Sequence, residues 1–166
     1  SKGKTFICKK CNYELEYNLI RKFESKKNKV VFDNIRDWNI WQQKNLYTFL
    51  ECTNTEDNII LKDDDLVFHT GYKSTKPKHL VFGSLVLKKN VSFVELIIRN
   101  NDGDTIESFP IIEISGLNIQ NKEHLELYHN NILYTIKGKK RRFSAYKWLK
   151  ALEYLLMDKT AQFQAH

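Results

Sequence analysis

Residues 144–156 read SAYKWLKALEYLL, and this stretch decides the fold of the second half of the chain. Its apolar side chains recur at the i, i+3, i+4, i+7 spacing of an amphipathic helix. Ser144 can accept hydrogen bonds from the first helical amides, so the sequence predicts that the helix begins there. The apolar stripe comprises Ala145, Trp148, Leu149, Leu152, Leu155 and Leu156. A helix with such a stripe needs a second apolar surface to cover.

Short β segments precede this helix and can supply that surface. Alternation of apolar and polar residues, as in Leu125-Glu126-Leu127-Tyr128, is typical of half-buried strands. Turn-forming pairs such as Asp63-Asp64 and Asn130-Asn131 separate the segments. Strands are expected near residues 58–62, 65–71, 79–88, 91–99, 104–110, 111–118, 123–129 and 132–137.

About seven antiparallel strands followed by one helix resemble a pleckstrin-homology-like domain. The resemblance implies a mainly β (α+β) fold, in which a C-terminal amphipathic helix closes one end of a β-barrel or roll. Trp148 stands where the helix of such a domain presses a tryptophan into that end. A generic β-sandwich with a trailing helix is the alternative.

A helix and a cysteine pair come before the β segments. Asp33 or Asn34 can cap a helix that carries Trp38 and Trp41 on one face, where we expect them to anchor it against the following domain. We therefore expect four parts: a partial zinc-ribbon knuckle with its connection and a short strand at 30–32, a linking helix, the β domain with its helix, and a tail. Their ranges are 1–32, 33–54, 55–158 and 159–166.

Cys8 and Cys11 have the Cys-x-x-Cys spacing of a zinc knuckle, with strand-like residues on both sides. Two thiolates supply half of the four ligands of a structural zinc site, so we expect the completing pair upstream and a longer parent protein. A reduced pair without metal is the main alternative, and a redox pair is less favoured because no helix follows. Three cysteines in all are too few for a disulfide framework, which favours a reducing cytoplasm.

The net charge of +7 is concentrated at the two ends of the chain. Residues 1–30 carry nine basic and three acidic side chains, and residues 137–166 carry eight and two. The densest cluster comprises Lys137, Lys139, Lys140, Arg141 and Arg142. Such a cluster attracts anionic lipid headgroups, contacts nucleic acid phosphates, or is a solvated loop without a ligand.

The early part of the chain also resembles a known family. The knuckle at Cys8 and Cys11, followed by Asn34-Ile35-Arg36-Asp37-Trp38-Asn39-Ile40-Trp41, is similar to the region after the catalytic domain in bacterial 1-acylglycerol-3-phosphate acyltransferase-like (lysophospholipid acyltransferase-like) proteins. The likeness runs from about residue 4 to residue 157, although Asn12 stands where that knuckle usually has glycine.

The resemblance implies a part of the protein that does not carry the chemistry. Those enzymes use a histidine and an aspartate four residues apart, and no histidine of this chain is followed by aspartate at that spacing. We therefore expect a non-catalytic accessory domain in phospholipid biosynthesis, next to an upstream catalytic domain and at the inner face of a membrane. A nucleic-acid-binding or protein-interaction module with a zinc ribbon is the alternative.

Overall fold

A computed structural model describes residues 4–7, 14–18, 20, 22–26, 29–52, 57–71, 80–139 and 143–163. The chain divides into two compact units, Ser1–Leu46 and Tyr47–His166. Among the described residues, no helix is both long and apolar enough to cross a lipid bilayer.

The first unit contains a small antiparallel sheet and most of one helix. Strands β1 (Lys4–Ile7), β2 (Glu14–Tyr17) and β3 (Phe23–Glu24) lie in that order. The strand predicted at 30–32 is wrong, because the extended segment that pairs with β2 is β3. Phe23 explains the difference: it is buried, and its ring contacts that of Tyr17 at 5.3 Å.

Helix α1 (Ile35–Cys52) begins after the predicted cap. The Asn34 side-chain oxygen accepts hydrogen bonds from the amides of Arg36 (2.9 Å) and Asp37 (3.1 Å), which satisfies two of the first helical donors. The two tryptophans of α1 make their ring contacts within the first unit. Trp38 packs edge-on against Phe23, and Trp41 packs against Phe32. The expectation that they anchor the helix against the following domain stays a prediction.

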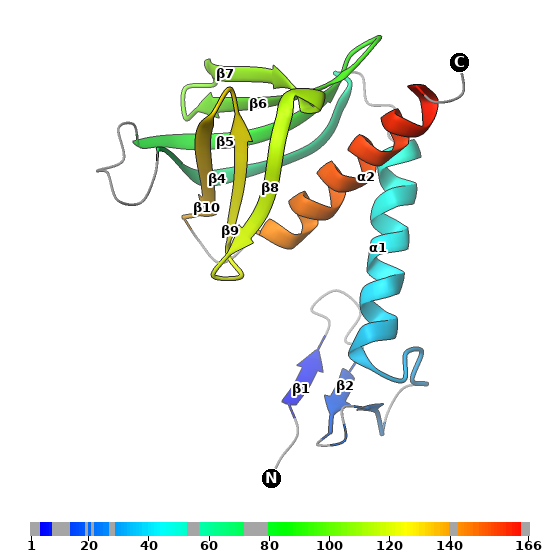
Figure 1. Cartoon of the computed structure of the whole chain (residues 1–166). Coiled ribbons are helices and arrows are strands. Elements are labelled where there is room, and N and C mark those ends of the chain that lie inside the picture. Colours follow the sequence, from blue (N-terminus) through cyan, green and yellow to red (C-terminus); the bar gives the residue numbers. More distant parts are fainter. Residues whose placement is uncertain are drawn as a thin grey trace. The chain divides into compact units, whose positions relative to one another are not determined.

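The second unit is a single antiparallel sheet with a C-terminal helix (Figure 1). Its strands lie in the order β7-β6-β5-β4-β10-β9-β8, and Figure 1 shows the sheet curling into a roll. This is the predicted pleckstrin-homology-like arrangement of seven strands followed by a helix. The elements are β4 (Ile59–Thr70), β5 (Leu80–Lys89), β6 (Val94–Asn100), β7 (Thr105–Pro110), the 3-10 helix η1 (Ile111–Glu113), β8 (Ile114–Gln120), β9 (His124–His129), β10 (Ile132–Gly138) and α2 (Ala145–Phe163).

Strand β4 runs through a sequence that predicts a turn. The turn expected at Asp63-Asp64 is wrong: the pairing of β4 with β5 only shifts register between Asp63 and Leu66. Asp65 takes a positive φ of 59°, a conformation that aspartate tolerates better than most residues. This β-bulge bends the strand without ending it, and apolar pairing resumes at Leu66.

The bulge also places a hydrogen-bond acceptor beside helix α2. The Trp148 side chain is fully buried, and its indole N–H donates to Asp63 Oδ2 at 2.6 Å. Lys147 Nζ donates to the same oxygen at 2.8 Å. The Ser144 hydroxyl accepts from the Lys147 amide at 3.2 Å, which confirms the predicted cap. Helix α2 continues to Phe163, beyond the predicted start of the tail at residue 159.

Candidate anion-binding depression

One row of paired residues crosses five neighbouring strands of the sheet. From β5 to β8 the register joins Phe82, Val67, Lys137, His124 and Gln120, each directly opposite the next. Directly paired residues of neighbouring strands lie on the same face of a sheet. The row therefore brings a lysine and a histidine side by side on the face that does not form the main core.

A half-open depression of about 720 Å³ lies over the middle of this row. Val67 and Phe143 provide apolar walls, while Lys137, Lys139 and His124 provide hydrogen-bond donors or positive charge. The lining residues are Val67, Glu123, His124, Lys137, Gly138, Lys139 and Phe143. The depression thus combines apolar walls with two lysines, a histidine and one acidic residue, Glu123.

Lys139 is held at the rim by its own backbone. Its amide donates to the carbonyl oxygen of Asp65 at 2.8 Å, so the bulge of β4 fixes the chain just after β10. The Lys139 ammonium lies 5.3 Å from the centre of the Phe82 ring, and Phe82 is 39% exposed. A cation and an accessible apolar ring therefore occupy neighbouring positions on one surface.

The electrostatics beside the depression are positive. His69 of β4 pairs with Thr135 of β10, which lies two residues before Lys137. Burial lowers the pKa of His69, and the charges of Lys137 and then His124 lower it further. Its Nδ1 atom is buried and has no hydrogen-bond partner among the residues that the structure describes. An anion placed beside Lys137 would relieve this accumulation of positive charge.

The structure brings part of the predicted site together. Lys137 and Lys139 line the same depression, whereas Lys140, Arg141 and Arg142 lie outside the described residues. Sequence reasoning missed His124, because its proximity to Lys137 depends on strand register, and it missed Phe143, which lies in the connection between β10 and α2. Only the alternation of β9 could have indicated that His124 shares a face with Lys137.

The predicted zinc ligands Cys8 and Cys11 also lie outside the described residues, so the half site stays a prediction. Within the described ranges, no group of three or more His, Cys, Asp and Glu side chains could hold a metal ion.

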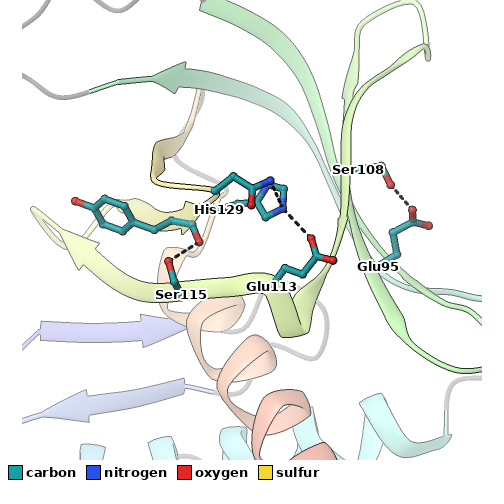
Figure 2. A network of polar contacts seen from close by, with 7 residues as sticks. Glu95, Ser108, Glu113, Ser115 and His129 are labelled. Carbon is teal, nitrogen blue, oxygen red and sulfur yellow. Dashed lines mark hydrogen bonds and ion pairs between the residues drawn. The ribbon is translucent and has the colours of Figure 1, made fainter.

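A second polar network lies at the other end of β9 (Figure 2). His129 Nε2 lies 2.9 Å from a carboxylate oxygen of Glu113, and the ring stacks on Phe109 with centroids 4.1 Å apart. The burial pattern of β9 places His124 and His129 on opposite faces of the strand. Only 9% of His129 is exposed, and the residue pairs with Ile132 of β10 and Ile114 of β8. The pair joins η1 to β9.

Neighbouring contacts in Figure 2 have the same structural character. The Ser115 hydroxyl donates to the Tyr128 carbonyl at 3.4 Å, and the Ser108 hydroxyl donates to Glu95 across β6 and β7. Neither hydroxyl is bonded to His129, so the described residues of this network do not form a nucleophile–base pair.

No family model and no curated protein matches the chain. Among solved structures, the chain is similar to the pleckstrin homology domain of USP37, with 16% identity, a TM-score of 0.44 and coverage of 57% of this chain and 99% of that one. It is also similar to the N-terminal pleckstrin homology domain of human ARAP2, with 11% identity, a TM-score of 0.42 and coverage of 66% and 88%. The fold assignment depends on the strand order and the terminal helix.

Proposed function

We propose that the second unit is a non-catalytic binding module whose depression takes anionic lipid headgroups at a membrane surface. The observation that supports this most strongly is the convergence of Lys137, Lys139 and His124 around one depression with apolar walls. Ammonium and imidazole groups donate hydrogen bonds to phosphate oxygens. The exposed Phe82 ring beside Lys139 can enter the region between headgroups and acyl chains.

The expected affinity is that of a peripheral membrane protein. Each basic residue near an anionic surface contributes about 1 kcal/mol. Lys137 and Lys139 together would therefore favour anionic over neutral membranes by about 2 kcal/mol, or about 30-fold. Lys140, Arg141 and Arg142 follow directly in the sequence and would add to the same preference.

Nucleic acid phosphates could contact the same lysines, but the aromatic rings favour a membrane. Binding of single strands relies on exposed aromatic faces on which bases stack. Here Lys139 lies over the ring of Phe82, and Trp148 is fully buried. Trp148 is thus unavailable for base stacking, and the exposed Phe82 ring beside Lys139 is suited to insertion between lipid headgroups.

The proposal also includes a longer parent protein and a zinc ion bound near the start of the chain. An upstream acyltransferase domain and a zinc ribbon with Cys8 and Cys11 as half of its ligands follow from the resemblance in the sequence. The residues encoded upstream of Ser1 test both: a second Cys-x-x-Cys pair, preceded by a histidine and an aspartate four residues apart, would support them. Their absence would remove the acyltransferase parent.

Vesicle sedimentation tests the lipid site. Wild-type protein should sediment with vesicles containing phosphatidic acid or phosphatidylglycerol far more than with phosphatidylcholine vesicles. The double variant Lys137→Ala/Lys139→Ala should lose about 30-fold in partitioning. Lys88→Ala/Lys89→Ala removes the same charge from the end of β5 and should retain most of the binding. Equal, negligible sedimentation with both vesicle types would refute the proposal, and tighter retention on single-stranded DNA would favour the alternative.

A further inference from the structure

A second cavity, of about 340 Å³, opens between five strands on the inner side of the roll. Helix α2 packs against β8, β9 and η1, and none of these elements lines it. Most of its walls are aliphatic or aromatic. The lining residues are Phe68, Thr70, Val81, Ile98, Ile106, Glu107, Ile132 and Tyr134.

One acidic residue, the solvent-exposed Glu107, lines this apolar cavity. Glu107 pairs directly with Ile98, which is almost fully buried, so the two side chains share the inner face of the sheet. Neither a hydrogen bond nor an ion pair joins Glu107 to another of the residues that the structure describes. An inward-facing charge on the edge strand β7 also discourages pairing with other chains. This protection of the sheet edge by Glu107 does not involve Tyr134, another polar residue that lines the cavity.

The second polar group is the hydroxyl of Tyr134. The residue as a whole is only 3% exposed, but its hydroxyl is not among the enclosed polar atoms that lack a hydrogen-bond partner. Burial raises the pKa of Tyr134, and the negative charge of Glu107 raises it further. A carboxylate and a tyrosine hydroxyl therefore line the same apolar cavity.

We propose that this cavity binds a small primary ammonium ion with a hydrocarbon body. The ammonium group would donate hydrogen bonds to the Glu107 carboxylate and the Tyr134 hydroxyl oxygen, and the methylene groups would pack against Ile98, Ile106 and Ile132. A purely apolar occupant, such as an acyl chain, would remove water from the carboxylate without replacing its hydrogen bonds, which is unfavourable. A carboxylate ligand would be repelled.

The cavity volume lies at the small end of the range for ligand pockets, which fits a compact ligand. This inference is independent of the lipid-binding proposal, because the two cavities share no lining residue.

The test is a titration followed by methyl NMR signals of Ile98, Ile106 and Ile132. The probe is n-hexylammonium chloride, with 1-hexanol and sodium hexanoate as neutral and anionic probes of equal length. Hexylammonium should give saturable shifts with a dissociation constant on the order of millimolar. It should bind about tenfold more tightly than hexanol, since hydrogen bonds to charged groups are stronger than neutral ones.

Glu107→Gln should abolish the preference for ammonium over alcohol, and Tyr134→Phe should weaken hexylammonium binding several-fold. Glu126→Gln is the matched control: Glu126 lies on β9, contacts Asn118 and does not line the cavity. Amide signal dispersion verifies that each variant is folded. Absence of saturable shifts with hexylammonium, equal affinity for hexanol, or an unchanged preference in Glu107→Gln would overturn the proposal.

Discussion

Replacing Trp148 by alanine is the most direct perturbation of the contact between helix α2 and the sheet. The side chain is fully buried, and truncating such a tryptophan typically costs 3–5 kcal/mol. Asp63 would lose the indole N–H but would keep the ammonium of Lys147, so no large penalty for an unpaired carboxylate is added. Domains of this size are stable by about 5–15 kcal/mol, so the variant should remain folded but weakened.

Urea unfolding should be followed by the amide signals of β9 and β10, which report the second unit alone. We expect Trp148→Ala to lower the free energy of unfolding by about 4 kcal/mol. Trp148→Phe keeps most of the apolar area but removes the N–H donor, and should cost about 1–3 kcal/mol. Trp41→Ala, at a residue 48% exposed in the first unit, is the control and should leave these signals unchanged. A loss below about 1 kcal/mol for Trp148→Ala would refute the reasoning.

Three further perturbations test other parts of the structure. Burial and the charge of Lys137 lower the pKa of His69 below 6.5 in the folded state, so the unfolded state binds more protons on acidification. Stability should be complete above pH 6.5 and fall below it, and His69→Gln should flatten this fall in urea titrations across pH. Gly83→Ala should lower the free energy of unfolding by more than about 3 kcal/mol, because the new Cβ would lie 1.7 Å from the Arg99 carbonyl oxygen. An unchanged thermal unfolding temperature would contradict this close approach of β5 and β6. Asn34→Ala should cost about 1 kcal/mol of helix stability, measured as faster amide exchange at the start of α1.

The helices could be predicted from the sequence because their signals are local. The stripe that contains Trp148, the cap at Ser144 and the cap at Asn34 depend on residues within a few positions of each other. Most strands of the roll followed from alternation and turn residues in the same way, although β4 was expected as two strands divided at Asp63-Asp64. These features needed no knowledge of which strands pair.

The errors arose where pairing between strands overrides local preference. Asp63 and its two acidic neighbours favour a turn in isolation, yet β4 continues because the apolar residues after them pair with β5 and β10. His129 is in phase with the buried Leu125 and Leu127, and its ring stacks on Phe109, which comes from another strand. Single-strand patterns contain no information about such partners.

The candidate site was predictable only in part for the same reason. The charge cluster drew attention to Lys137 and Lys139, since they are close in sequence. Their neighbours in the depression come from other segments: Val67 from β4 and His124 from β9. Strand register decides this set, and a shift of one residue would turn His124 to the other face.

Amide chemical-shift mapping tests the proposed lipid site most directly. Isotope-labelled protein should be titrated with nanodiscs that contain phosphatidic acid, and with phosphatidylcholine nanodiscs as the control. We expect the largest shifts at His124, Lys137, Gly138 and Lys139, only with the anionic lipid, and a decrease as salt is added. Shifts that gather instead at the acidic turn between β6 and β7, or that are the same for both lipids, would contradict the account.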